Sequence, residues 1–306
     1  MFIDKLKQIF IKHQPINVDD FLIIGHRGSP NVMVENTIES FDYAIKQGAN
    51  AIELDVCLTK DQNVIAWHDW NPNDVVALTR QLGLESSRYI PYYPDVESDD
   101  RKRTSLKTLD EIRRHFGYKD RKGNKKDAFI PVLADVFSWA NKQEGLKCIF
   151  LDIKIPSDEK HHAQLMMKKI NHLIDIYQPK YKIVVMSCDI DILLEMKKVA
   201  KNVEFTLDII LPLGVIFDTN KYSAVKKAKE YGFSYASVGR AVVGQLYPWK
   251  TYMSIINKDV IDKNHIKLIS WTIKDISEMK ELIKSGVNGI MVDDPNILKS
   301  IVDKFK

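Results

Sequence analysis

Short apolar runs alternate with amphipathic segments along most of the chain. Eight of these runs have the length and residue types of buried strands, and they cover residues 21–25, 50–56, 147–153, 182–187, 203–207, 234–238, 267–272 and 289–293. Segments between them repeat apolar residues at helical spacing, including residues 37–47, 158–177, 189–200, 219–231, 275–285 and 295–304. Eight strand–helix units predict a (β/α)8 TIM barrel, with a doubly wound open sheet as the alternative.

The ends of the predicted helices carry suitable capping residues. Asp189 and Asp275 stand where two helices should begin, and an aspartate there accepts hydrogen bonds from free backbone N–H groups. Gly48, Gly232 and Gly286 stand where helices should stop, as glycines at helix C-termini do. Because no linker rich in Pro, Gly or Ser divides the chain, we expect a single domain over residues 1–306.

Two segments interrupt the strand–helix pattern after the second predicted strand. Residues 63–68 form a short apolar run that residues 59–62 separate from it, which predicts a β-hairpin extension of that strand. Residues 71–104 follow, rich in Tyr, Pro, Asp and Arg, and we expect an irregular loop insertion there. Loops of that length usually carry function or move.

Charge and cysteine content narrow the class of protein. A formal net charge of +4 over 306 residues argues against a dedicated nucleic-acid binder and suits a small anionic ligand. The chain has three cysteines without close spacing, which indicates free thiols in a reducing compartment. No stretch reads as a signal peptide or a membrane span. We therefore expect a cytoplasmic protein without stable membrane insertion.

The predicted strand at residues 50–56 carries two acidic residues on one face. Side chains alternate along a strand, so Glu53 and Asp55 point away from the apolar residues at positions 52, 54 and 56. In a barrel the apolar set packs on the helices, and the two carboxylates face the axis near the C-terminal mouth. Burying two like charges without a partner costs several kcal/mol, so something cationic should lie between them.

The predicted strand at residues 147–153 repeats this pattern with Asp152 and Lys154. Three inward carboxylates from two strands favour one hard divalent cation, Mg²⁺ or Ca²⁺, as a cofactor. The alternative is a buried network in which Lys154 and Arg27 neutralise the acids without a metal.

Histidines end two of the predicted strands. His26 and Arg27 lie between Gly25 and Gly28 where the first strand ends, and His68 ends the hairpin strand. A histidine transfers protons near neutral pH, and the planar fork of an arginine matches phosphate oxygens. Two histidines beside a metal and an arginine indicate acid–base chemistry on a phosphoryl group.

These motifs together resemble the glycerophosphodiester phosphodiesterase family from about residue 21 to residue 299. The segment at residues 25–69 contains, in order, the family's His-Arg-Gly, Glu-Asn-Thr, Glu-x-Asp-Val and His-Asp motifs. Further on, residues 151–154 match its acidic-x-Lys strand, residues 271–272 its Trp-Thr strand end, and residues 286–295 its closing motif. The combination is highly specific in its order and spacing.

The resemblance implies metal-dependent hydrolysis of small glycerophosphodiesters to an alcohol and glycerol 3-phosphate. It implies that Glu53, Asp55 and Asp152 bind the cation, and that His26 and His68 act as base and acid. Arg27 and Lys154 would hold the phosphate, and Trp271 would line the pocket for the alcohol. The third metal ligand of the family is usually Glu, so Asp152 is a departure that is one methylene shorter.

Two other functions fit the same residues. A lysophospholipase D would use the same site with a lipid tail against an apolar lip, for which the candidates are Tyr89, Tyr92, Tyr93, Tyr247, Trp249 and Tyr252. A catalytically inactive phosphodiester-binding protein would keep Arg27 and Lys154 but tolerate a weaker metal site. The sequence leaves the head group, the cation and the oligomeric state open.

Overall fold

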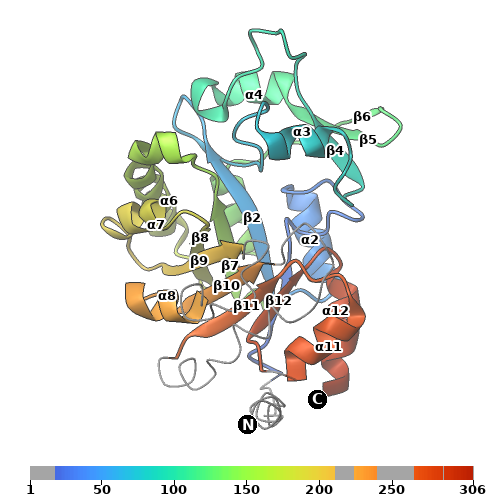
Figure 1. Cartoon of the computed structure of the whole chain (residues 1–306), viewed down its shortest axis with the longest axis vertical. Coiled ribbons are helices and arrows are strands. Elements are labelled where there is room, and N and C mark those ends of the chain that lie inside the picture. Colours follow the sequence, from blue (N-terminus) through green and yellow to red (C-terminus); the bar gives the residue numbers. More distant parts are fainter. Residues whose placement is uncertain (1–17, 211–223, 240–264, 285, 306) are drawn as a thin grey trace, which may run out of the picture.

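A computed structural model describes residues 18–210, 224–239, 265–284 and 286–305 of the chain. Eight parallel strands form a barrel, in which β1 pairs with both β2 and β12 and so closes the sheet (Figure 1). The strands are β1 (Leu22–Gly25), β2 (Ala51–Leu58), β7 (Cys148–Ile153), β8 (Lys182–Ser187), β9 (Glu204–Ile210), β10 (Tyr235–Gly239), β11 (Lys267–Trp271) and β12 (Gly289–Val292). All eight predicted strands are confirmed, and with them the TIM barrel.

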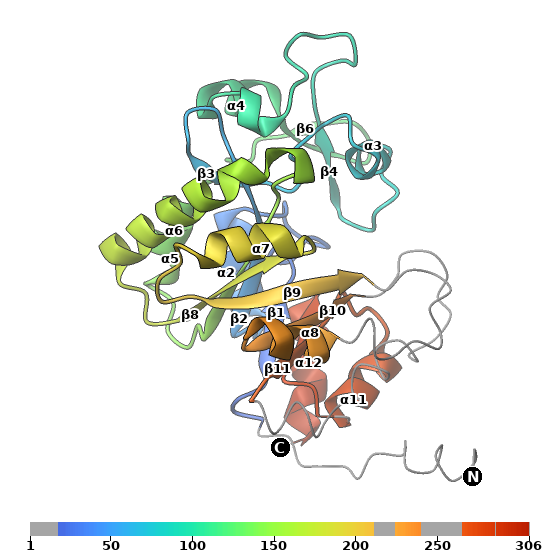
Figure 2. The same cartoon turned by 60° about the vertical axis from the view of Figure 1, so that its left-hand side comes forward.

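Helices cover the outside of the barrel (Figures 1 and 2). They are α2 (Ile38–Lys46), α5 (Leu133–Ala140), α6 (Ala163–Tyr177), α7 (Ile190–Lys197), α8 (Ala224–Tyr231), α11 (Ile276–Lys284) and α12 (Pro295–Val302), with a 3-10 turn η3 (Asp303–Phe305) at the end. The helix predicted over residues 158–177 begins with the 3-10 turn η2 (Ser157–His162), and the start of the one over residues 219–231 lies outside the described residues. Helix α5 was not predicted.

The predicted helix caps are present. The Asp189 carboxylate accepts a hydrogen bond from the backbone N–H of Asp191, and Asp275 accepts one from that of Glu278. Gly48, Gly232 and Gly286 have φ of 95°, 64° and 81°, the left-handed conformation that ends a helix.

The strands sort apolar and polar side chains as the alternation predicted. Ile52, Leu54 and Val56 of β2 are buried against the helices. Inside the barrel, Ile24, Phe150 and other apolar side chains fill the lower layer of the core. Polar residues therefore gather above this layer, where the strands end.

The polypeptide between β2 and α5 forms an insertion beside the barrel mouth, in the upper part of Figure 1. Strand β3 (Val64–Ala66) pairs antiparallel with β2, which confirms the hairpin extension. The expected loop insertion over residues 71–104 is present, and it is not irregular throughout, because it contains a short helix and a short strand. The insertion consists of α3 (Val75–Gln81), β4 (Tyr89–Tyr92), η1 (Thr104–Leu106), α4 (Leu109–His115), β5 (Gly117–Asp120) and β6 (Lys125–Lys126), with β4, β5 and β6 in one sheet.

A separate apolar cluster explains the order of the insertion. Trp67, Ile112, Phe116 and Tyr118 are buried together, and the rings of Trp67 and Tyr118 have centroids 5.0 Å apart. Each element is only two to seven residues long, so packing between distant segments, rather than local periodicity, stabilises it.

The cysteines are unpaired in the structure. Cys57, Cys148 and Cys188 are free thiols. No helix among the described residues is long and apolar enough to cross a membrane.

The loop after β1 depends on a glycine without space for a side chain. Gly28 has φ of 86°, and a Cβ there would lie 2.6 Å from the backbone carbon of Ser40. Gly123 has a similar φ of 93° but nothing within 4 Å of the corresponding position. The two positions share backbone strain and differ in steric room.

We predict that Gly28→Ala is more destabilising than Gly123→Ala. Left-handed backbone costs each variant about 1–2 kcal/mol, and the overlap with Ser40 adds about 1–3 kcal/mol at position 28 only. Urea unfolding of both variants would measure the difference. Equal losses would contradict the close approach of α2 to this loop.

Candidate active site

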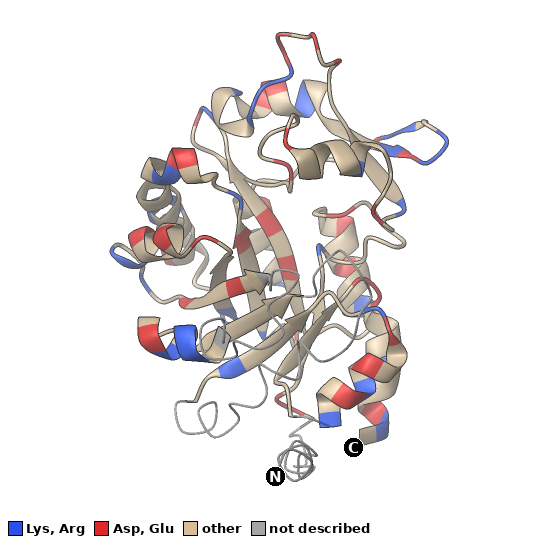
Figure 3. Ribbon diagram, viewed as in Figure 1, with Lys and Arg blue, Asp and Glu red and all other residues tan. Residues whose placement is uncertain are grey.

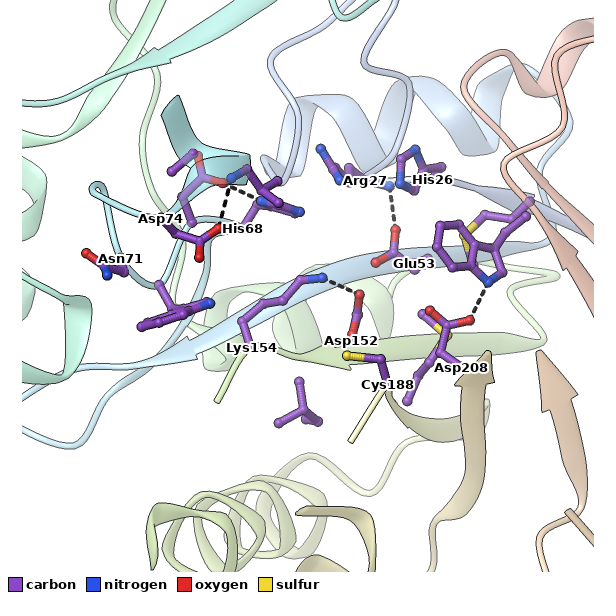
Figure 4. A pocket seen from close by; sticks show the side chains of 18 residues that line it. His26, Arg27, Glu53, His68, Asn71, Asp74, Asp152, Lys154, Cys188 and Asp208 are labelled. Carbon is purple, nitrogen blue, oxygen red and sulfur yellow. Dashed lines mark hydrogen bonds and ion pairs between the residues drawn. The ribbon is translucent and has the colours of Figure 1, made fainter. Parts of the chain in front are cut away.

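A cavity of about 360 Å³ lies at the C-terminal mouth of the barrel, beside α3 of the insertion. Seven of the eight predicted site residues line it: His26, Arg27, Glu53, His68, Asp152, Lys154 and Trp271. The eighth, Asp55, is buried and contacts Arg27 and Lys154. In Figure 4, Glu53, Asp152 and Lys154 lie between His68 on one side and His26 on the other.

Three carboxylates from two neighbouring strands converge in the cavity. Asp55 of β2 pairs in register with Asp152 of β7, and Glu53 lies two residues before Asp55 on the same face. Oxygens of Glu53, Asp55 and Asp152 lie within 4.8 Å of one another. The expectation that these acids meet is therefore confirmed.

Two basic side chains contact this acidic group unevenly. Lys154 Nζ lies 2.5 Å from Asp152 Oδ2 and 3.1 Å from Asp55 Oδ1, and Arg27 Nε lies 3.0 Å from Asp55 Oδ2. Burial alone would raise the pKa of Asp55, but the charges of Arg27 and Lys154 hold it well below its ordinary value. Asp55 is thus fully ionised.

Glu53 is the member of the group that the basic residues leave without an ion pair. Its Oε2 accepts a hydrogen bond of 2.8 Å from the backbone N–H of Arg27, and no Lys or Arg side chain in the described ranges makes an ion pair with it. Burial, with the charges of Asp55 and Asp152, raises the pKa of Glu53 well above its ordinary value. Lys154 and Arg27 therefore do not neutralise the whole group, and its oxygen-only donor set fits a hard divalent cation.

The ring of His26 is held by an aspartate that lies near the other end of the sequence. Its Nδ1 lies 2.7 Å from Oδ1 of Asp293, which follows β12. Burial alone would raise the pKa of Asp293, but the hydrogen bond from His26 and the charge of Lys274 keep it lowered. A carboxylate on Nδ1 fixes the ring, and Nε2 is the nitrogen left for the cavity.

His68 has the same arrangement with its neighbour in sequence. Its Nδ1 is hydrogen-bonded to Oδ1 of Asp69, and the other oxygen of that carboxylate, Oδ2, accepts hydrogen bonds from Arg80 and from the Tyr93 hydroxyl. Burial lowers the pKa of His68, and the charges of Arg27 and Arg80 lower it further. Sequence reasoning assigned the two aspartates no role, although Asp69 stands beside His68 and Asp293 lies in the closing motif.

An ion-pair network ties the insertion to the first barrel loop. Arg80 of α3 is buried, and its guanidinium pairs with Glu35 and, at 2.8 Å, with Glu85. The same two carboxylates lie 3.1 and 3.3 Å from Arg27 Nη1. Sequence reasoning missed Arg80 and Glu85, since nothing in their local sequence marks them.

Asn36 connects the first loop to β2 rather than to the cavity. Its Nδ2 donates to Asp55 Oδ2 at 2.8 Å, and its Oδ1 accepts from the Asp55 backbone N–H at 3.1 Å. A left-handed φ of 55° places it there. The side chain thus orients one carboxylate of the acidic group.

Trp271 rests against an acidic residue that the sequence did not suggest. Its Nε1 donates to Oδ1 of Asp208 at the end of β9, and Gly239 of β10 gives its ring room, because a Cβ there would lie 2.6 Å from Cε2. Burial and the charge of Asp152 raise the pKa of Asp208 to about 7. The strand was expected to end at residue 207, which left Asp208 outside the pattern.

The residues suggested as an apolar lip for a lipid tail are not the ones that line the cavity in the described part of the chain. Tyr93 packs into the insertion, with its ring edge-on to Trp67 at 5.9 Å, and neither Tyr89 nor Tyr92 of β4 lines the cavity. Tyr247, Trp249 and Tyr252 lie outside the described residues. Val76 and Ala77 of α3 line the cavity instead.

We predict that the Asp208→Asn variant of the metal-free protein becomes more stable relative to the wild type as pH rises. The carboxyl has a pKa of about 7 when folded and of about 4 when unfolded. The folded state therefore binds more protons between these values, and its stability falls as pH rises through about 7. An asparagine can still accept from Trp271 without that penalty.

The measurement is Tm in excess chelator from about pH 5 to about pH 8. The Tm of the variant minus that of the wild type should increase over this pH range. A constant difference in Tm would contradict a raised pKa at Asp208.

Comparison with known proteins extends over nearly the whole chain. A family model described as the glycerophosphoryl diester phosphodiesterase family matches residues 26–297. A glycerophosphodiester phosphodiesterase of Caldanaerobacter subterraneus is 28% identical over 290 residues, which are 92% of this chain and 98% of that protein.

Solved structures show the same fold. The crystal structure of a glycerophosphoryl diester phosphodiesterase, so described, from Silicibacter pomeroyi has a TM-score of 0.71 at 17% identity, covering 98% of this chain and 97% of that one. A phosphodiesterase of Oleispira antarctica, solved with the product sn-glycerol-3-phosphate, has a TM-score of 0.64 at 16% identity and covers 92% and 96%.

Proposed function

Because the chain belongs to the glycerophosphoryl diester phosphodiesterase family, we propose that it hydrolyses glycerophosphodiesters to an alcohol and glycerol 3-phosphate with His26 and His68 as its proton-transfer groups. The observation that carries this assignment is the pair of histidines at one cavity, each with an aspartate on Nδ1. Both rings keep Nε2 for the substrate. General acid–base catalysis needs two such groups, one for the attacking oxygen and one for the leaving oxygen.

We propose that Glu53, Asp55 and Asp152 hold one divalent cation, Mg²⁺ or Ca²⁺. Their convergence and the raised pKa of Glu53 support this, because a cation would relieve the repulsion between them. When bound, the cation would supply Lewis-acid polarisation of a phosphoryl oxygen and offset developing negative charge. Asp152 is a competent oxygen ligand despite its shorter side chain.

Arg27 and Lys154 are proposed to bind the phosphate oxygens. Both line the cavity, and neighbouring carboxylates hold the pKa of each above its ordinary value although burial opposes this. Their positive charge is therefore constant over the working pH range. Fixed cations of this kind stabilise the charge that develops on phosphorus-bound oxygens in the transition state.

The two histidines divide the proton transfers. Following the resemblance, His26 takes the proton of the attacking oxygen and His68 protonates the departing alkoxide. Asp293 and Asp69 stabilise whichever ring becomes charged. The attacking group is water or a neighbouring hydroxyl of the substrate, and both need the same base.

The remaining assignments rest on the sequence. We propose one domain over residues 1–306, a cytoplasmic location because the three cysteines are unpaired, and a small-molecule glycerophosphodiester as the partner. The competing function is that of a catalytically inactive phosphodiester-binding protein. A measurement of turnover distinguishes such a protein from the proposed enzyme.

We predict metal-dependent release of glycerol 3-phosphate from glycerophosphocholine by the purified protein. Excess chelator should abolish release, and Mg²⁺, Ca²⁺ or Mn²⁺ should restore it to different extents and so identify the working cation. Full activity in chelator would exclude the metal from the reaction. Tight binding without release under every metal would favour the binding protein.

We predict that His26→Ala and His68→Ala each lower kcat by about 10²–10⁴-fold, because each removes one proton transfer. Both variants should keep the wild-type circular dichroism spectrum and Tm within a few degrees. His172→Ala, on the exposed face of α6, is the matched control and should keep full activity.

The leaving group then separates the two roles. A p-nitrophenyl ester needs no acid, so it should restore turnover in the variant that lacks the acid, expected to be His68→Ala. Rescue of His26→Ala alone would exchange the roles. Wild-type turnover in either variant on glycerophosphocholine would remove that histidine from the mechanism.

A further inference from the structure

Helix α3 turns an apolar stripe toward solvent. Val75, Leu78 and Leu82 are 69%, 41% and 75% exposed, and their spacing of three and four residues places them on one face. The opposite face is buried through Ala77 and Arg80. A surface helix normally buries its apolar side, so this one has the reverse arrangement.

The stripe is continuous with the rim of the cavity. Leu84, two residues beyond Leu82, is 72% exposed, and Val76 and Ala77 on the flank of α3 line the cavity itself. Single exposed apolar residues are ordinary, but a contiguous set beside a binding site marks an interaction surface.

A basic hairpin adjoins this stripe. The guanidinium of Arg121, in the turn between β5 and β6, donates to the backbone carbonyls of Gly83 at 2.9 Å and Ser87 at 2.8 Å. The exposed cations there are Arg88, Arg121, Lys122, Lys125 and Lys126, against the acids Asp120 and Asp127. In Figure 3 the tip of this hairpin is mostly blue.

Contacts with the barrel fix the segment between the stripe and the hairpin. Lys274, after β11, donates to Ser86 and lies 3.2 Å from Asp293. Glu85 pairs with Arg80 and Arg27 on the inner side. The surface therefore has a set orientation relative to the cavity mouth.

We propose that the α3–hairpin face, made of the exposed apolar residues 75, 78, 82 and 84 and the exposed basic residues 88, 121, 122, 125 and 126, docks on an anionic lipid bilayer. Peripheral membrane binding has two features. Apolar side chains enter the membrane interface, and cations beside them contact anionic lipid head groups. Docking turns the cavity mouth toward the bilayer, where phosphodiesters that carry an acyl chain are presented. That last step rests on the proposed function, whereas the docking does not.

Co-sedimentation with vesicles tests the docking independently of catalysis. The full-length protein should sediment with vesicles of mixed phosphatidylcholine and phosphatidylglycerol, less with phosphatidylcholine alone, and less as salt rises. The double variant Leu82→Ser, Leu84→Ser should bind the mixed vesicles at least about tenfold more weakly, since it loses two apolar anchors. Lys122→Glu with Lys125→Glu should weaken binding to the mixed vesicles by a similar factor, because two cations that meet anionic head groups are reversed in charge.

Matched controls separate docking from general changes of the surface. Ile176→Ser on α6 removes an exposed apolar side chain far from α3, and Lys180→Glu reverses an exposed charge beside it. Both should bind vesicles like the wild type. The leucine variant should also hydrolyse soluble glycerophosphocholine at the wild-type rate, because neither leucine lines the cavity.

Three results would overturn the proposal. The wild type would fail to bind the mixed vesicles, or the α3 and hairpin variants would bind like the wild type, or the control variants would lose as much affinity. A wild-type dimer that Leu82→Ser converts to a monomer, without vesicle binding, would assign the stripe to contact between copies of the chain. Vesicle binding without glycerophosphocholine turnover would instead reject the proposed function and keep the docking.

Discussion

Repulsion among buried carboxylates at the barrel mouth is the constraint on which the rest of the site depends. Glu53, Asp55 and Asp152 are brought together by the strand register, so the fold itself creates the repulsion. Isolated buried charges cost several kcal/mol each. The neighbouring polar groups offset part of that cost. Arg27 and Lys154 do so as cations, and Asn36 and the Arg27 backbone N–H do so as hydrogen-bond donors. Glu53 remains incompletely compensated, which is the property of a site built for a cation.

The insertion extends the same electrostatic logic beyond the barrel. The guanidinium of Arg27 contacts Glu35 and Glu85 as well as Asp55. These two acids are in turn held by Arg80, which also reaches Asp69 and through it His68. Helix α3, which lies outside the barrel, thus helps to position both Arg27, in the loop after β1, and His68, which follows β3. Because breaking a buried pair typically costs about 3–5 kcal/mol, α3 cannot move far from the barrel without disturbing both.

The sequence predicted the barrel and the acidic group well because both depend on local periodicity. Alternation in β2 fixes the side of Glu53 and Asp55, and the parallel pairing of β2 with β7 brings Asp152 beside them. It did not show the short elements inside the insertion, whose order depends on contacts such as that of Trp67 with Tyr118. It also missed Arg80, whose partner Glu35 lies 45 residues away. Asp208 was lost for a simpler reason, since β9 runs to residue 210 rather than 207.

The two histidines show how the same local chemistry arises by different routes. His68 and Asp69 are adjacent in sequence, so their contact needs only the correct turn at the end of β3. His26 and Asp293 are 267 residues apart and meet because β1 and β12 are neighbours at the seam of the barrel. The first pair can therefore be held by the insertion even if the seam loosens, whereas the second requires the closed barrel. A catalytic function that needs both rings is thereby coupled to the folding of the whole chain, and not to any one segment of it.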